Sequence, residues 1–197
     1  PIKSDMPRTK HLLIVNPVSG KRKGLAIVES VRPIFDKADI ELTILITQSH
    51  NHAFDIARTY NLEQYQAICI AGGDGTAHQV INGMFSRNDG IELPIGLIPA
   101  GTGNSFLHDL KLTDPIMATH AIINGNSCHY DLAEIKSENK IIYSFNVIGW
   151  GVPVDINILA EKLRWSRGQR YNLAAIIEIL RNRQRWARIT LDDQVLE

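Results

Sequence analysis

The sequence predicts an α/β fold built on a parallel sheet, because apolar strands and amphipathic helices alternate along its first 125 residues. The expected strands are short, continuous apolar runs, which are typical of strands covered on both faces. The connections between elements are short, and three of them are rich in glycine. In a parallel sheet, ligands bind at the carboxyl ends of the strands. We therefore expect a ligand site at that edge of the sheet.

Four strands and four helices account for this first region. The strands are expected over residues 11–15, 41–47, 67–71 and 93–98. Apolar residues at helical spacing predict helices over 25–35, 51–60, 77–85 and 114–125. Pro33 is expected to kink the first helix or to end it early. Asp114 followed by Pro115 is a typical helix start, and Gly125 can close that helix. The glycine-rich loops 16–24, 72–76 and 99–105 follow the first, third and fourth strands.

The pattern changes after Gly125. Two strands are expected over 130–136 and 141–148, joined by a hairpin loop at 137–140. A break at 149–153, helices over 154–165 and 171–182 and a strand over 186–191 should follow. These strands are too few to close a sandwich or barrel. We therefore predict an α/β nucleotide-binding domain at 1–125 and an incomplete β-rich, lipid-binding domain with inserted helices at 126–197, in a truncated chain.

The composition excludes several classes of function. The 197 residues contain 21 Lys+Arg and 21 Asp+Glu, so net charge creates no overall attraction to nucleic acid. Cys69 and Cys128 lie far apart and suggest neither a disulfide nor a zinc site, which fits a cytoplasmic protein. The seven histidines form no metal-binding pattern. No apolar run approaches ~18 residues, so the chain is expected to visit a membrane peripherally rather than to cross it.

The loop 72–76, Gly-Gly-Asp-Gly-Thr, carries the chemistry that the sequence suggests most clearly. Glycines allow a sharp turn and a close approach to a ligand, and the helix that follows offers unpaired N–H groups to a phosphate. Asp74 would lie where phosphates bind, which makes sense if it organises a cation or accepts a proton from a hydroxyl. The alternative is a plain strand-to-helix turn in which Asp74 only caps the helix. The Gly-x4-Gly-Lys-Ser/Thr and Gly-x-Gly-x-x-Gly signatures are both absent.

Three motifs in order resemble one known family. Asn-Pro-Val-Ser-Gly-Lys at 16–21, Gly-Gly-Asp-Gly-Thr at 72–76 and Pro-Ala-Gly-Thr-Gly-Asn at 99–104 resemble the catalytic domain of the diacylglycerol kinase and sphingosine kinase superfamily. The resemblance covers about residues 10–125, and 126–192 more loosely. The second motif alone also occurs in NAD kinases and, in varied form, in phosphofructokinases. The resemblance implies a first domain like the phosphofructokinase core, a second domain that is a β-sandwich, and an active site between them.

The resemblance also implies roles for individual residues. Asp74 would be catalytic, as a base or as an organiser of Mg²⁺, and Asp155 would face the lipid head group. The residues that match nucleotide-binding or phosphate-binding positions of the family are Asn16, Ser19, Gly20, Lys21, Thr47, Gly72, Gly73, Gly75, Thr76, Gly101, Thr102, Gly103 and Asn104. Arg164 and Arg170 fall near arginines that reach ATP phosphates in relatives. ATP and Mg²⁺ are the cofactors implied, and no dedicated protein metal site is expected.

Three further features leave alternatives open. Basic residues interleaved with aromatic ones between 162 and 188 predict a solvated helix face, a phosphate contact or docking to an anionic membrane; no module for nucleic acid is recognisable. Apolar residues at helical spacing between Leu173 and Leu180 suggest a core face rather than a lipid groove. The strand edges of a half-built domain leave room for a partner chain, so a homo-oligomer is one expectation.

The function expected from the sequence is an ATP-dependent lipid kinase. It would transfer the γ-phosphate to a hydroxyl of a diacylglycerol-like lipid or a sphingoid base, at a membrane surface. Asp155 favours the sphingoid base slightly, because a carboxylate pairs with an ammonium. The alternatives are a nucleotide kinase of the NAD kinase type, which the Gly-Thr-Gly-Asn loop disfavours, and a catalytically silent module that binds a nucleotide or a lipid.

Overall fold

The computed structural model describes residues 8–101, 103–138, 140–149, 151–163, 169–181, 183, 185, 188–191 and 194–196. Its contacts divide the chain into two compact units, Pro1–Asn146 and Val147–Glu197. Each unit is described by itself below. Among the described residues, no helix has both the length and the apolar character needed to cross a bilayer.

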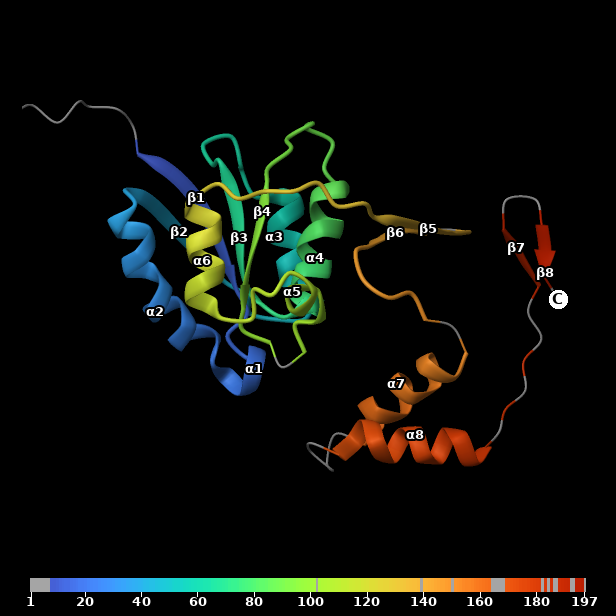
Figure 1. Ribbon diagram of the computed structural model, residues 1–197. Coiled ribbons are helices and arrows are strands. Elements are labelled where there is room, and N and C mark those ends of the chain that lie inside the picture. The colour runs from blue at the N-terminus through green and yellow to red at the C-terminus, as the bar shows by residue number, and fades with distance from the viewer. Residues whose placement is uncertain are drawn as a thin grey trace, which may run out of the picture. The chain divides into compact units, whose positions relative to one another are not determined.

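A four-stranded parallel sheet forms the centre of the first unit. Its strands are β1 (Thr9–Val15), β2 (Ile40–Ile46), β3 (Ala67–Gly72) and β4 (Ile95–Pro99), in the order β2-β1-β3-β4 (Figure 1). The register pairs Val15 with both Ile46 and Ala71, and Gly72 with Pro99. The four strands therefore end at one edge, and the predicted α/β fold is confirmed.

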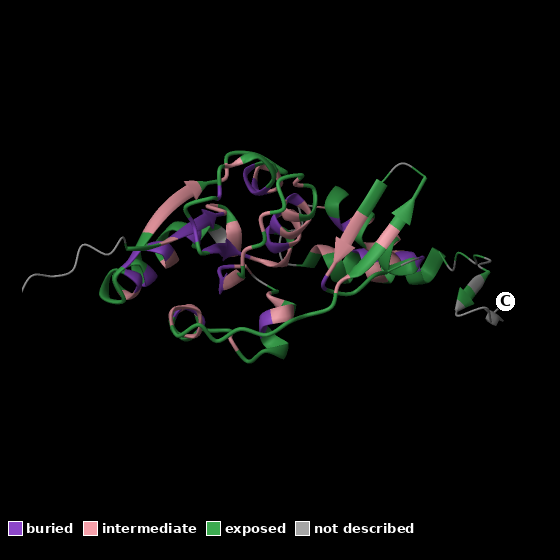
Figure 2. Ribbon diagram, turned by 90° about the horizontal axis from the view of Figure 1, so that it is seen from above, coloured by how far each residue is buried: buried purple, intermediate pink, exposed green. Residues whose placement is uncertain are grey.

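Helices cover both faces of this sheet. They are α1 (Ser19–Arg22), α2 (Gly24–Lys37), α3 (His52–Thr59), α4 (Asp74–Phe85), α5 (Ser105–Asp109) and α6 (Pro115–Ile123). Alternate strand residues point to opposite faces. Leu12, Ile14, Ile68 and Ile70 belong to a core cluster with buried residues of α3 and α4. Leu13, Val15, Cys69 and Ala71 belong to a second cluster, formed with α2 and flanked by Ile122 and Ile123 of α6. Figure 1 shows the same arrangement, and Figure 2 shows the buried residues gathered where these helices meet the sheet.

Two local expectations for this region differ from the structure. Of the two expectations for Pro33, a kink or an early end, the early end is not seen, because α2 continues to Lys37. The missing proline N–H costs one hydrogen bond, whereas the turn beyond Pro33 buries Phe35 completely. The region 16–24, expected as a loop, contains the short helix α1.

A β-hairpin completes the first unit. Strands β5 (Ala133–Ser137) and β6 (Lys140–Ser144) are antiparallel and shorter than the sequence predicts. The side chain of Asn82 on α4 holds this hairpin, because its Nδ2 donates to the Tyr143 carbonyl and its Oδ1 accepts from the Tyr143 amide, both at 2.8 Å. The rings of Phe85 and Tyr143 stack with their centroids 4.2 Å apart. The hairpin thus packs on α4, within the unit that ends at Asn146.

The second unit contains two helices and a short strand pair. These are α7 (Val152–Lys162), α8 (Arg170–Arg181), β7 (Ile189–Leu191) and β8 (Gln194–Leu196), the two strands being antiparallel. Both predicted helices are present, with ends shifted by one to three residues. The assignment of residues 126–197 to one second domain stays a prediction.

Candidate functional site

The order of the strands creates a crevice between two loops at the carboxyl edge. The chain passes from β1 outward to β2, and then crosses to the other side of β1 to form β3. The connections that leave β1 and β3 therefore run to opposite sides, which is the point where open α/β sheets bind ligands. The loop 16–18 follows β1, and the loop 72–76 follows β3, so two of the predicted motifs meet at this point.

A hollow of about 340 Å³ lies at this edge. Its volume falls within the range of roughly 300–1,000 Å³ that small-molecule sites occupy. It is lined by the β1 loop, the β2–α3 connection and the first turns of α4, through Asn16, Pro17, Val18, Thr47, Gln48, Ser49, His50, Ala53, Thr76 and Gln79. Asn16 Nδ2 donates to Thr76 Oγ1 at 3.0 Å, and the Thr47 amide donates to the Val15 carbonyl at 2.8 Å. These bonds fix three separate segments around one space.

The start of α4 offers backbone donors beside this hollow. Gly73 is the N-cap residue in an extended conformation, and its carbonyl accepts from the amides of Thr76 and Ala77. The amides of Asp74 and Gly75 precede any acceptor of their own helix and carry the partial positive charge of its end. A Cβ built on Gly75 would meet no atom within 4 Å, and the backbone there is not left-handed. Neither sterics nor backbone conformation requires glycine at 75, whereas the close approach of a phosphate would.

Three other glycines have a steric reason within the protein. Gly20 has a φ of +54°, and a Cβ there would lie 2.1 Å from the Ala100 carbonyl oxygen. A Cβ on Gly72 would lie 2.7 Å from Thr76 Cβ, and one on Gly101 would lie 2.6 Å from the Cα of Gly73. Gly20 and Gly101 thus allow the loops after β1, β3 and β4 to approach one another through their backbones, and Gly72 leaves room for the Thr76 side chain.

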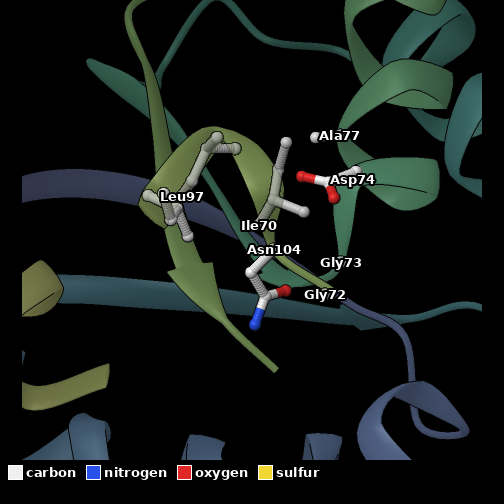
Figure 3. Close-up of a pocket in the computed structure, with 8 residues that line it drawn as sticks. Ile70, Gly72, Gly73, Asp74, Ala77, Leu97 and Asn104 are labelled. Atoms are coloured by element: carbon white, nitrogen blue, oxygen red, sulfur yellow. The ribbon is translucent and has the colours of Figure 1, made fainter. Parts of the chain in front are cut away.

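Asp74 is the first residue of α4, and its carboxylate is held by another loop. Its Oδ2 accepts the backbone N–H of Ser105 at 2.9 Å. Figure 3 shows Asp74 and Asn104 beside a small cavity that is also lined by Ile70 of β3 and Leu97 of β4. This cavity measures about 10 Å³ and has no room for a substrate. The substrate-sized space is the hollow on the side of β1 and β2.

The structure brings together most of the predicted nucleotide-site residues. Asn16, Ser19, Gly20, Thr47, Gly72, Gly73, Gly75, Thr76, Gly101, Gly103 and Asn104 all lie in or next to the loops that follow the four strands. The backbone of Lys21 lies in α1, but its side chain is outside the described part of the chain. Thr102 and Arg164 lie outside the described residues as well. The functional roles of all these residues stay predictions.

Asp155 and Arg170 belong to the second unit, where each has a protein partner. The guanidinium of Arg185 contacts both carboxylate oxygens of Asp155, at 2.7 and 2.8 Å. Arg170 lies 3.5 Å from the carboxylate of Glu161, and its guanidinium carbon lies 4.9 Å from the centre of the Tyr171 ring. A lipid head group would therefore compete with Arg185 for Asp155, and ATP would compete with Glu161 and the Tyr171 ring for Arg170.

Several residues that line the hollow were missed by the sequence analysis. Gln48, Ser49 and His50 line it from the β2–α3 connection, and Gln79 lines it from α4. Their signal was available, because Gln48 to His50 directly follow a strand end and Gln79 lies one helical turn beyond Thr76. The connection is held by His52, whose Nδ1 accepts the Gln48 amide at 3.0 Å. Arg185 was missed as the partner of Asp155, since thirty positions separate the two in sequence.

The site contains few ligands for a metal. The described residues include no group of three or more acidic, histidine or cysteine side chains able to hold an ion. Mg²⁺ characteristically binds through one or two carboxylates together with substrate phosphates and water. Asp74 supplies one carboxylate two residues before Thr76, which lines the hollow, and this fits that mode; a permanent cage built from protein ligands does not fit the described residues.

Comparisons with known proteins agree with the geometry. The family model of the diacylglycerol kinase catalytic domain matches residues 10–135. Sphingosine kinase 1 of Arabidopsis thaliana is 36% identical over 194 residues, which are 92% of this chain and 40% of that protein. Ceramide kinase of Mus musculus is 32% identical, over 86% of this chain and 35% of that protein. A diacylglycerol kinase structure from Bacillus anthracis matches with a TM-score of 0.53 and 27% identity, covering 62% of this chain and 46% of the other.

Proposed function

The chain belongs to the diacylglycerol kinase catalytic domain family, and from this premise we propose that it transfers the γ-phosphate of ATP to the hydroxyl of a lipid. Kinases of this family use ATP. The chain spans about 40% of the length of Arabidopsis sphingosine kinase 1, so its activity and its lipid substrate are both part of the proposal. The acceptor would be a sphingoid base or a diacylglycerol-like lipid, reached at a membrane surface.

One observation carries the proposal. Helix α4 begins with Asp74, whose carboxylate is hydrogen-bonded, and Gly75, which has open space beside it, and this helix starts where the connections from β1 and β3 diverge. Gly75 leaves room for a phosphate against the α4 amides, and Asp74 is the neighbouring residue. Phosphoryl transfer needs charge neutralisation and alignment more than covalent help from the protein. The free amides at the N-terminus of α4 would neutralise phosphate charge, and the fixed carboxylate of Asp74 would help to align the reacting groups.

The residues of the site have distinct tasks in this reaction. The amides of Asp74 and Gly75, together with Thr47 and Lys21, would hold the ATP phosphates in the hollow. Mg²⁺, when bound, would neutralise charge on the phosphate oxygens. The lipid hydroxyl oxygen would attack the γ-phosphorus while the bond to the ADP oxygen breaks. Asp74 would either take the hydroxyl proton or orient the water on Mg²⁺.

The lipid class is suggested by relatives and by one side chain. The similar proteins include a sphingosine kinase and a ceramide kinase. Asp155 could pair with the ammonium of a sphingoid base. That head group would share the carboxylate with Arg185, which already contacts both of its oxygens. We favour a sphingoid base because a sphingosine kinase is among the similar proteins and Asp155 offers a carboxylate to its ammonium; a diacylglycerol-like acceptor is the alternative.

A transfer assay tests the proposal directly. The protein expressed from its complete coding sequence would be given radiolabelled ATP and Mg²⁺ with sphingosine, ceramide, diacylglycerol or monoacylglycerol in mixed micelles. We expect one labelled lipid, and we expect Asp74→Asn to abolish it. Asp36→Asn removes the same charge from the exposed end of α2 and should leave the rate unchanged. Labelled product from NAD but from no lipid would replace the proposal with a nucleotide kinase, and ATP binding without any turnover would indicate a silent module.

A further inference from the structure

The loop after β4 is closed by the side chain of Asn104. Its Oδ1 accepts the Gly101 amide at 3.1 Å, and its Nδ2 donates to the Gly101 carbonyl at 3.0 Å. Asn104 itself has a left-handed backbone, with φ at +50° and ψ at +43°. Asparagine tolerates this conformation better than most residues. One carboxamide therefore holds both backbone polar groups of Gly101 and ties Gly101 to Asn104.

This closed turn delivers one donor to Asp74. The residue that follows Asn104 is Ser105, whose amide donates to Asp74 Oδ2 at 2.9 Å. Within the described part of the chain, this amide is the one hydrogen-bond donor to the Asp74 side chain. Oδ2 is thereby fixed, and among the described residues no hydrogen bond to Oδ1 is formed.

The same turn is also pressed against the backbone that precedes Asp74. A Cβ on Gly101 would lie 2.6 Å from Gly73 Cα and 2.6 Å from Asn104 Oδ1. A Cβ on Gly103 would lie 3.7 Å from Asp74 Oδ2, which is ordinary contact. The backbone before Asp74 and the carboxylate of Asp74 are thus both held by residues 101–105. Figure 3 shows Gly73, Asp74 and Asn104 gathered around one small cavity.

We propose that Asn104 is a positioning residue, whose carboxamide holds Gly101 so that the Ser105 amide orients the Asp74 carboxylate for phosphoryl transfer. The inference rests on the proposed function and deepens it. It assigns the Gly-Thr-Gly-Asn loop to the carboxylate, whereas the family resemblance assigns that loop to the nucleotide. The two assignments predict different kinetic effects, because a lost nucleotide contact raises KM for ATP and a misplaced carboxylate lowers kcat.

The variant Asn104→Gly separates the effect of the side-chain hydrogen bonds from the effect of the left-handed backbone. Glycine accepts the left-handed conformation at no steric cost, so the variant removes only the two carboxamide bonds. Asn51→Gly is a matched control, because Asn51 is also a left-handed N-cap residue, with φ at +69°, and makes no side-chain cap bond. Neither change should prevent folding, which a melting curve of each variant checks.

We expect Asn104→Gly to lower kcat about 10-fold to 100-fold, the size of effect that a small misplacement of a catalytic group produces. KM for ATP should stay within about two-fold of the wild-type value, and Asn51→Gly should change neither constant. A raised KM with an unchanged kcat would overturn the inference in favour of a nucleotide contact. An equal fall in kcat in Asn51→Gly would overturn it by showing that the effect is not specific to this turn.

Amide exchange at Ser105, followed by NMR, separates this inference from the proposed function. The wild-type amide should be protected, and the protection should be lost in both Asp74→Ala and Asn104→Gly. A protected Ser105 amide in a protein that phosphorylates no lipid would refute the kinase proposal and its positioning role, while leaving the contact itself established. An unprotected wild-type amide beside normal lipid phosphorylation would refute the positioning inference alone.

Discussion

Replacing Gly75 with alanine should stabilise the protein and weaken its binding of ATP. Gly75 is the second residue of α4, its backbone is not left-handed, and an added Cβ would meet nothing within 4 Å. Alanine at such a position restricts the unfolded chain without straining the folded one, which is worth about 0.4–1 kcal/mol. For a chain of this size, about 1 kcal/mol corresponds to ~2–4 °C in melting temperature. The expected rise in Tm is therefore about 1–4 °C.

The effect on ATP should have the opposite sign. A methyl group at 75 would occupy the space through which a phosphate approaches the α4 amides. Loss of one hydrogen bond to a charged group costs about 1.5–3 kcal/mol, which is roughly 10-fold to 150-fold in Kd. Calorimetric titration with ATP and a thermal melt of the same samples measure both quantities.

Gly90 provides the matched control for this experiment. A Cβ there would also meet nothing within 4 Å, but the backbone has a φ of +70°. Gly90 lies between α4 and β4, away from the carboxyl edge. Gly90→Ala should therefore lower Tm by a few degrees, since a left-handed alanine costs roughly 1–2 kcal/mol, and should leave ATP affinity unchanged. An unchanged ATP affinity in Gly75→Ala would refute the placement of phosphate at the start of α4.

Three further predictions concern stability. Gly83→Ala, on the same helix as Gly75, should lower the free energy of unfolding by about 1–3 kcal/mol, because its Cβ would lie 2.5 Å from the Phe54 carbonyl oxygen. A thermal melt measures this loss of stability. An unchanged melting temperature would contradict the close packing of α3 on α4. Asn82→Ala leaves the amide and carbonyl of Tyr143 without their α4 partner and should destabilise the packing of the hairpin on α4 by about 2 kcal/mol. Amide exchange across β5 and β6 should then be faster. Unchanged exchange would show that other contacts hold the hairpin. Burial lowers the pKa of His11 below its ordinary value of 6.5, so the unfolded chain binds the proton more readily than the folded one. The free energy of unfolding should therefore fall as the pH drops below about 6.5. Urea titrations at pH 7.5 and 5.5 measure this fall, which should be smaller in His11→Leu.

Most of the first unit could be predicted because its signals are local. Each strand is a continuous apolar run, and each long helix repeats apolar residues at its own period, so both can be recognised within a few residues. Of the two expectations for Pro33, a kink or an early end of the helix, the early end is wrong for the same reason. The expectation considered the missing N–H of proline, which is local, and not the burial of Phe35 in the turn after Pro33, which depends on the packed sheet.

The candidate site was predictable in its location but not in its contacts. The loops after β1, β3 and β4 had to share one edge, since parallel strands all point the same way. Why each glycine is needed depends on what lies opposite it. Gly20, Gly72 and Gly101 face atoms of other loops or of their own helix, whereas Gly75 faces open space.

The α/β alternation, the edge that carries the loops and the family of the chain could all be predicted from the sequence. These properties depend on periodicity and on short motifs, which are properties of neighbouring residues. The strand order, the pairing of Asp155 with Arg185 and the contact of Asp74 with the Ser105 amide became visible in the folded structure alone. Such contacts join residues about thirty positions apart: packing of the loops at the edge of the sheet brings Ser105 to Asp74, and the fold of the second unit brings Arg185 to Asp155.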